Sequence, residues 1–241
     1  MQTITQILAA ELGCAEKYVQ NVVALLDEGN TIPFIARYRK EAHGGMDDTA
    51  LRTLETRLQY LRSLEARRAE VRELIAAQEK LTDALSAQID AAATLAELED
   101  IYRPFRPKRR TRATIAKEKG LEPLADAIFA QTRDMLPPEK LALDYIDPEK
   151  GVESVEDALA GAGDILAERI SDDAALRKRL RELTAQQAVL RSKAAKEEDS
   201  VYRLYYDFTQ PVSRLQSHQV LALNRGEREG WLRISVDMDE E

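Results

Sequence analysis

Eight basic side chains lie within seventeen residues near the middle of the chain, a stretch we call the basic segment (residues 103–119). Pro104 and Pro107 keep its entry out of a regular helix, so the cations cannot all lie on one helix face. Cations that neutralise phosphates release counterions, which makes such binding non-specific and salt-dependent. We therefore predict phosphate contacts, with principal residues Arg106, Lys108, Arg109, Arg110 and Arg112 and supporting residues Arg103, Lys117 and Lys119.

Two other interpretations of the basic segment remain open. It is a solvated loop, or its cations clamp the neighbouring acids Glu97, Glu99 and Asp100. An earlier basic group, residues 37–40, is a weaker candidate for phosphate contact. Its cations either contact phosphate or clamp acids of the long helix that follows. This group consists of Arg37, Arg39 and Lys40.

Residues for catalysis or metal binding are scarce. His43 and His218 are the only histidines, and they are far apart in the sequence without metal-ligand spacing. His43 falls in a glycine-rich loop, where exposure or a capping hydrogen bond is expected. Paired acids, such as Asp172 and Asp173, lie where helices are expected to begin or end, which capping explains. The chain also lacks a phosphate-binding glycine motif. We expect no enzyme activity, no cofactor and no metal site.

A helix-turn-helix-like frame is present near the N-terminus. Ala9 allows two helices to approach closely, Gly13 permits the turn, and Val19 packs beneath the second helix. The second helix would present Lys17, Gln20 and Asn21 to base edges, but its acids would repel phosphate. Because an ordinary helical hairpin explains the same three positions, we favour the hairpin and keep the DNA-reading frame as the alternative.

The surroundings of these candidates are those of a helix-rich protein. The chain has 241 residues and 27.2 kDa, with 44% hydrophobic, 32% charged and only 5% aromatic residues. Its formal charge is −8, but the basic segment carries +7, so the rest carries −15. No apolar run approaches the ~20 residues of a membrane span, and no signal peptide is evident. The single Cys14 fits a reducing compartment, so we expect a cytoplasmic protein with no membrane partner.

The elements that position the candidates are mostly helices. Leucines at spacings of three and four predict a long helix over 51–75, in which Arg68 interrupts the apolar face. Further helices are expected from Ser154 onward and over 176–190, and Leu232–Val236 alternates as a short strand. We predict a mainly α, multi-helical fold with two packed helical subdomains, 1–119 and 120–241, and a short C-terminal β element. A lone strand needs a partner in an oligomer, in an irregular segment of this chain or in chain beyond residue 241.

Several blocks of the sequence resemble the bacterial transcription accessory protein Tex family. They span nearly the whole chain in order: Leu26–Glu41 (LDEGNTIPFIARYRKE), Leu95–Pro104 (LAELEDIYRP), Pro107–Ala116 (PKRRTRATIA), Lys119–Asp126 (KGLEPLAD), Ser217–Leu223 (SHQVLAL) and Arg225–Glu227 (RGE). Gln216 and Gln219 depart from the proline and arginine that this resemblance leads us to expect, which leaves a basic contact at position 219 in doubt.

The resemblance implies a modular nucleic-acid-binding protein linked to transcription and related to eukaryotic elongation factors. It implies that this chain is the N-terminal helical region of a longer protein. The nuclease-like fold, the helix-hairpin-helix pair and the oligonucleotide-binding barrel of such a protein would then follow residue 241.

We therefore expect a non-enzymatic scaffold of a transcription-associated protein that contributes non-specific phosphate contacts, with the choice between DNA and RNA open. The alternative is a protein–protein docking module for polymerase or ribosomal components that binds no nucleic acid itself. Its acidic remainder would favour basic partners.

Overall fold

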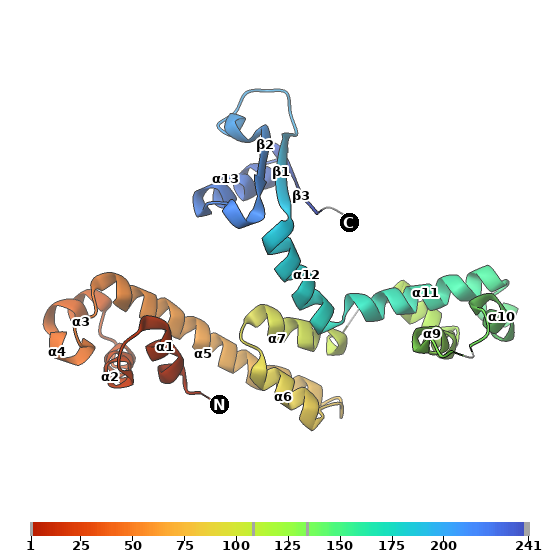
Figure 1. Cartoon of the computed structure of the whole chain (residues 1–241), viewed down its shortest axis with the longest axis horizontal. Coiled ribbons are helices and arrows are strands. Elements are labelled where there is room, and N and C mark those ends of the chain that lie inside the picture. The colour runs from red at the N-terminus through yellow and green to blue at the C-terminus, as the bar shows by residue number, and fades with distance from the viewer. Residues whose placement is uncertain (1, 108, 134, 239–241) are drawn as a thin grey trace. The chain divides into compact units, whose positions relative to one another are not determined.

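The computed structural model describes residues 2–107, 109–133 and 135–238, and its chain divides into two compact units, Met1–Pro107 and Lys108–Glu241 (Figure 1). Each unit is described by itself. The helices of the first unit are α1 (Ile4–Leu12), α2 (Glu16–Asp27), α3 (Ile32–Tyr38), α4 (Lys40–His43), α5 (Asp48–Ala76), α6 (Asp83–Ala91) and α7 (Leu95–Tyr102). The second unit contains α8 (Arg112–Glu118), α9 (Glu122–Ala130), α10 (Pro138–Ala142), α11 (Val155–Ser171), α12 (Ala174–Gln187), β1 (Val189–Ala194), β2 (Asp207–Pro211), α13 (Ser217–Arg228) and β3 (Leu232–Asp237).

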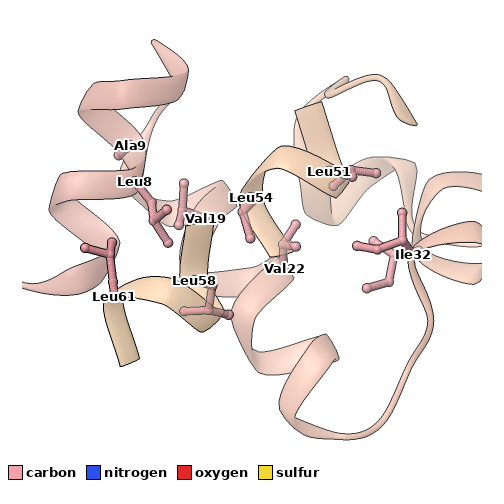
Figure 2. Close-up of a cluster of buried hydrophobic side chains, with 10 residues drawn as sticks. Leu8, Ala9, Val19, Val22, Ile32, Leu51, Leu54, Leu58 and Leu61 are labelled. Atoms are coloured by element: carbon pink, nitrogen blue, oxygen red, sulfur yellow. The ribbon is translucent and has the colours of Figure 1, made fainter. Parts of the chain in front are cut away.

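The long helix α5 organises the first unit. Asp47 caps it by accepting a hydrogen bond of 2.7 Å from the amide of Ala50. The first half of its leucine face packs with α1, α2 and α3 around Leu8, Val19 and Ile35, which are fully buried (Figure 2 shows most of this cluster). The second half packs against α6 and α7 in a separate cluster. The predicted long helix is thus confirmed.

The second unit begins with a helical part built around α11. Ser154 caps α11 by accepting a hydrogen bond from the amide of Asp157. One face of α11, rich in alanine, lets α8 and α9 approach closely, and small residues such as Ala116 and Ala162 are buried there with Leu124. Helix α12 follows without a buried residue of its own.

The C-terminal part of the second unit is a three-stranded antiparallel sheet in the order β2-β1-β3, packed against α13. β1 is the central strand, with Ser192 opposite Phe208 of β2 and Ile234 of β3. The expected C-terminal strand is therefore paired within the chain. The expectation of a helix over 176–190 is too long. The observed helix α12 ends at Gln187, and Leu190 belongs to β1.

The fold class is confirmed: the chain is mainly α with a short C-terminal β element. The division into 1–119 and 120–241 stays a prediction. Within the described residues, no helix is both long enough and apolar enough to cross a membrane.

Candidate nucleic-acid interface

The basic segment begins in the first unit with Arg103 and Arg106. Both residues are exposed: Arg103 begins a 3-10 turn, Arg103–Phe105, that directly follows α7, and Arg106 follows this turn. The Nη2 atom of Arg106 donates to the Oε2 atom of Glu99 at 2.5 Å, and its guanidinium lies 5.7 Å from the centre of the Tyr102 ring. Arg106 therefore forms the clamp to a neighbouring acid that one interpretation of the sequence describes.

Glu99 is shared by two arginines. Arg67 of α5 donates through Nε to the other carboxylate oxygen at 2.6 Å, and its guanidinium lies 5.3 Å from the same Tyr102 ring. The hydrogen bond from Arg67 and the charges of both arginines hold the pKa of Glu99 below its usual value, against a smaller opposing effect of burial. This cluster joins α5 to α7, so Arg106 has a structural task in this unit.

The second unit contains three exposed arginines of the basic segment. Arg109 is exposed and forms no ion pair with any described residue. Arg110 donates to Glu118 at 2.6 Å while its side chain stays 69% exposed, and Arg112 lies 3.4 Å from Asp164 with 86% exposure. Such exposed pairs contribute little to stability, so their arginines are available to a competing anion. Lys108 lies outside the described residues.

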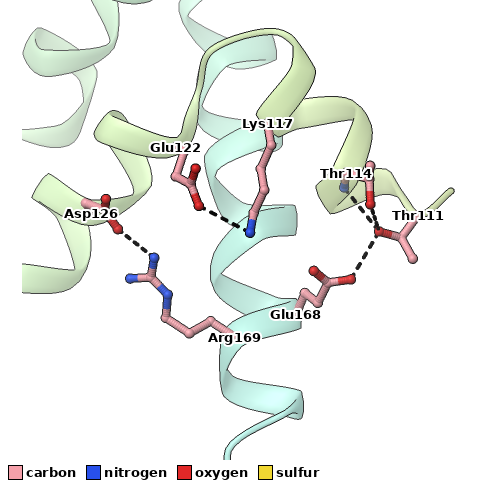
Figure 3. Close-up of polar contacts among 7 residues, drawn as sticks. All are labelled: Thr111, Thr114, Lys117, Glu122, Asp126, Glu168 and Arg169. Atoms are coloured by element: carbon pink, nitrogen blue, oxygen red, sulfur yellow. Dashed lines mark hydrogen bonds and ion pairs between the residues drawn. The ribbon is translucent and has the colours of Figure 1, made fainter. Parts of the chain in front are cut away.

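The remaining two cations tie α8 to its surroundings. Lys117 forms an ion pair of 3.2 Å with Glu122 at the start of α9 (Figure 3). The Nζ atom of Lys119 donates to the carbonyl oxygen of Gly151 at 2.7 Å. Both contacts hold α8 against the helical part of the second unit, so these side chains are engaged in the fold.

Thr111 fixes where the exposed arginines lie relative to α8. Its hydroxyl oxygen accepts a hydrogen bond from the amide of Thr114 and donates one to Glu168 of α11 at 3.0 Å (Figure 3). The N-cap therefore ends the extended stretch and starts the helix at Arg112. Arg109 and Arg110 precede the cap, outside the helix, as the prolines upstream predict.

Comparison with known proteins defines the relationship. A family model described as "Tex-like protein N-terminal domain" matches residues 2–76, and one described as "Tex central region-like" matches residues 133–241. The chain belongs to the Tex family. The resemblance found in the sequence is therefore confirmed, and the basic segment lies between the two matched regions.

Relatives of the Tex family align over nearly the whole chain. "Protein tex" of Bordetella pertussis (strain Tohama I) is 49% identical over 235 residues, covering 96% of this chain and 30% of that protein. "Transcriptional accessory protein Tex" of Neisseria gonorrhoeae is 44% identical over 237 residues, covering 97% and 31%. "S1 RNA-binding domain-containing protein 1" of Homo sapiens is 29% identical over 248 residues, covering 98% and 24%. The chain spans about a third of the length of these bacterial relatives.

The earlier basic group of this Tex-family chain lies on α3 and α4. Arg37, Arg39 and Lys40 are exposed, and none of them pairs with a described carboxylate. The idea that they clamp acids of the long helix is therefore wrong for the described residues. Beside them, the rings of Phe34 and Tyr38 contact each other with centroids 5.3 Å apart. Sequence reasoning missed this pair, although its spacing of four residues within a helix was a usable signal.

The helix-turn-helix-like frame of the Tex-family chain has well-defined geometry. Gly13 ends α1 with a left-handed φ of 63°, and Ala9 and Val19 are buried between α1 and α2. Of the side chains expected to read bases, Gln20 donates to Glu16, and Asn21 donates to the carbonyl oxygen of Ala42 at 3.2 Å. Both side chains are thus engaged within the protein; the hairpin stays the favoured interpretation, and DNA contact by this frame stays its untested alternative.

The histidines do not meet in a site. His43 is 3% exposed at the end of α4, so the expected exposure is wrong: residues 40–43 form a helical turn that packs against α2. His218 lies in the first turn of α13, in the other unit. No group of three or more His, Cys, Asp or Glu side chains in the described part of the chain is arranged to hold a metal ion.

Proposed function

We propose that this part of a Tex-family protein is a non-enzymatic scaffold that contributes non-specific phosphate contacts to a transcription-associated protein. Its contact residues are Arg109, Arg110 and Arg112, together with Lys108. Lys117 and Lys119 hold α8, while Arg106 stabilises the first unit through Glu99. The observation that carries the proposal is the exposure of three guanidiniums at or just before the start of α8, one unpaired among the described residues and two that stay exposed although each pairs with a carboxylate.

Electrostatics explains how these residues would act. An incoming phosphate replaces Glu118, which is 53% exposed, at little cost because that ion pair is already solvated. Asp164 is 31% exposed, but its contact with the 86% exposed Arg112 is long at 3.4 Å. Arg110 and Arg112 then exchange Glu118 and Asp164 for the ligand, while Arg109 needs no exchange. Guanidinium groups suit phosphate oxygens because two parallel N–H groups reach them together.

The names of two relatives support a proposed role in transcription and in nucleic-acid binding. The Neisseria gonorrhoeae relative is called a transcriptional accessory protein, and the human relative is called an S1 RNA-binding domain-containing protein. These names describe those longer proteins. For this chain we propose association with transcription and with nucleic acid, within a cytoplasmic protein, and we propose no enzymatic role.

A salt series tests the proposal. Anisotropy of a labelled single strand and a labelled duplex is measured with the wild-type chain and with Arg109→Ala/Arg112→Ala. The double variant should bind more weakly, and its log–log salt slope should fall by about 0.7 per lost contact on a single strand and about 0.9 on a duplex.

A charge-matched control comes from the same unit. Arg203 and Arg225 are 76% and 68% exposed and are each paired with an acid four residues away, so Arg203→Ala/Arg225→Ala removes the same charge elsewhere. This control should keep the wild-type slope. Equal losses in both double variants would reduce the proposal to a general charge effect, and undetectable binding of the wild type at low salt would favour the protein-docking alternative.

A further inference from the structure

The outward side of α3 presents two aromatic rings. Phe34 is 36% and Tyr38 60% exposed, and their ring centroids lie 5.3 Å apart with the planes tilted by 45°. The opposite side of α3 is buried, since Ile32 and Ile35 are 3% and 0% exposed in the core with α5. The two rings are therefore held at the surface by a helix whose other face is anchored.

Three cations lie on the same short stretch of chain as these rings, and its two arginines differ from most other arginines of the first unit. The guanidinium of Arg39 lies 5.6 Å from the centre of the Phe34 ring, and its sequence neighbours Arg37 and Lys40 are exposed. Neither Arg37 nor Arg39 pairs with a described carboxylate. By contrast, seven arginines of this unit do form such pairs: Arg52, Arg57, Arg62, Arg67, Arg68, Arg72 and Arg106.

The backbone beneath this surface is well fixed. Pro33 lies in the first turn of α3, where its ring suits the helix. Helix α4 is held against α2 by the bond from Asn21 to the carbonyl of Ala42. Gly44 then turns with a φ of 61° in close contact with the ring of Tyr18, where a side chain would collide. A ligand would thus meet rings and cations that are already positioned.

We propose that α3 and α4 form a stacking site for single-stranded nucleic acid, with bases on Phe34 and Tyr38 and phosphates at Arg37, Arg39 and Lys40. Aromatic rings near cations that pair with no described carboxylate match a strand whose bases are exposed and whose backbone is anionic. A duplex offers the same phosphates but keeps its bases stacked within the helix. The site lies in the first unit, and it stands independently of the phosphate contacts proposed for Arg109 and Arg112.

An abasic strand separates stacking from phosphate contact. The 241-residue chain is titrated with a labelled oligothymidine and with an abasic strand of the same length, in the wild type and in Tyr38→Ala and Tyr38→Phe. The wild type should bind the base-containing strand about fivefold or more tightly than the abasic strand. Tyr38→Ala should lose this preference, and Tyr38→Phe should keep it because the ring remains.

Phe129→Ala is the matched control. Phe129 is 53% exposed with the guanidinium of Arg169 at 5.1 Å from its ring, but Arg169 is paired with Asp126 at 2.5 Å. This variant should keep the wild-type preference. Equal binding of both strands by the wild type would overturn the proposal, as would a preference that survives in Tyr38→Ala.

Two further results separate this proposal from its alternatives. Arg109→Ala/Arg112→Ala should weaken both strands equally and leave the preference for bases intact, so each proposal fails on its own readout. A tryptophan-containing polyglutamate peptide serves as the probe for an acidic protein partner. If the affinity of that peptide, and not that of the oligothymidine, depends on Tyr38, the surface is a peptide site and the stacking proposal is wrong.

Discussion

At the scale of single residues, the arginines of this chain differ in what surrounds each guanidinium. Arg67 and Arg106 share one carboxylate and lie near one tyrosine ring, so they stabilise the junction of α5 and α7. Arg109 and Arg112 belong to the same basic segment as Arg106, but they are exposed to solvent. Residue type alone thus assigns a positive charge, and the neighbouring residues decide whether that charge serves folding or binding.

The carboxylate of Glu99 gives a pH-dependent prediction. Its pKa is lowered in the folded state by Arg67 and Arg106, so its contribution to stability is present above the unfolded value and is lost as the pH falls through the folded value. Glu99→Gln should lower the free energy of unfolding by about 1 kcal/mol at neutral pH, a modest value because the carboxylate is 34% exposed. The difference from the wild type should shrink below pH ~4.

Urea titrations at several pH values provide the measurement for Glu99. The exposed Glu73 of α5, which has no ion pair among the described residues, supplies the control. Glu73→Gln should cause no loss of stability at neutral pH. A Glu99→Gln penalty that stays constant down to acid pH would show that the charge of the carboxylate is not what stabilises the junction.

Two glycines of α11 give a second residue-scale prediction. A Cβ atom at Gly161 would collide with Leu121, which is 2% exposed, and would lie 3.4 Å from the Cβ atom of Ala116. At Gly163 nothing lies within 4 Å. Gly161→Ala should destabilise by about 1–2 kcal/mol, because overpacking outweighs the gain in helix propensity, whereas Gly163→Ala should stabilise by up to about 1 kcal/mol. Thermal and urea unfolding of both variants decide the sign, and changes of equal sign would contradict the packing at α11.

At the scale of elements, Arg68 shows how a polar residue can lie within the apolar face of α5. Its side chain is 10% exposed, and its Nη2 atom donates to the carbonyl oxygen of Ala92 at 2.5 Å. Ala92 is the C-cap of α6, the residue directly after its last helical residue. Arg68 also pairs with Glu65, one turn earlier on α5. The interruption in the leucine pattern therefore marks the point where α5 holds the end of α6.

Removing this guanidinium should loosen the packing of α6 on α5. Arg68→Ala should lower the free energy of unfolding by about 2–3 kcal/mol, because it leaves a buried carbonyl without its donor and opens a space in the packing. Arg52→Ala removes an arginine from an exposed pair on the same helix, where both side chains are more than half exposed, and should change stability by no more than about 0.5 kcal/mol. Chemical denaturation compares the two variants, and similar costs would refute the role of Arg68.

The helices and strands also show how much of this structure the sequence predicts. Period and capping residues predict α5 and α11, because each helix buries a regular apolar face of its own. They fail at residues 188–194, where an apolar and charged run reads as a continuation of α12. That run becomes β1 because β2 and β3 hydrogen-bond to both of its edges, a non-local effect that local spacing does not contain.

The candidate interface was predictable to a similar extent. Composition locates the basic segment, and its two prolines predict that its entry is not α-helical. The extended conformation expected from Pro104 is wrong, because Arg103–Phe105 is a 3-10 turn and the extended backbone begins at Arg106. Composition does not separate Arg106, which clamps Glu99, from Arg112, which stays 86% exposed, because the acids that decide this lie on other helices. The partner of Lys119 is a backbone carbonyl, and because every residue has one, the sequence does not indicate this contact.

At the scale of the whole molecule, the hydrophobic clusters divide along the two units. The clusters around Leu54 and around Val71 draw only on the first unit, and those around Leu124 and around Leu223 draw only on the second. Buried apolar contact is the main source of folding free energy, so each unit contains its own source of stability. We expect the two units to unfold in separate transitions.

Core truncations test this division. Leu54→Ala and Leu124→Ala each remove a side chain that is 0% exposed, and each should cost about 2–5 kcal/mol. Hydrogen exchange followed peptide by peptide should then show faster exchange only in the unit that carries the change. Helix α8 decides the boundary, because Ala113 and Ala116 pack with Leu124. If exchange in α8 speeds up in Leu124→Ala, α8 folds with the second unit and the division after residue 119 is wrong. If exchange in α8 speeds up in Leu54→Ala, that division holds. If exchange speeds up in both units with either change, the chain unfolds as one.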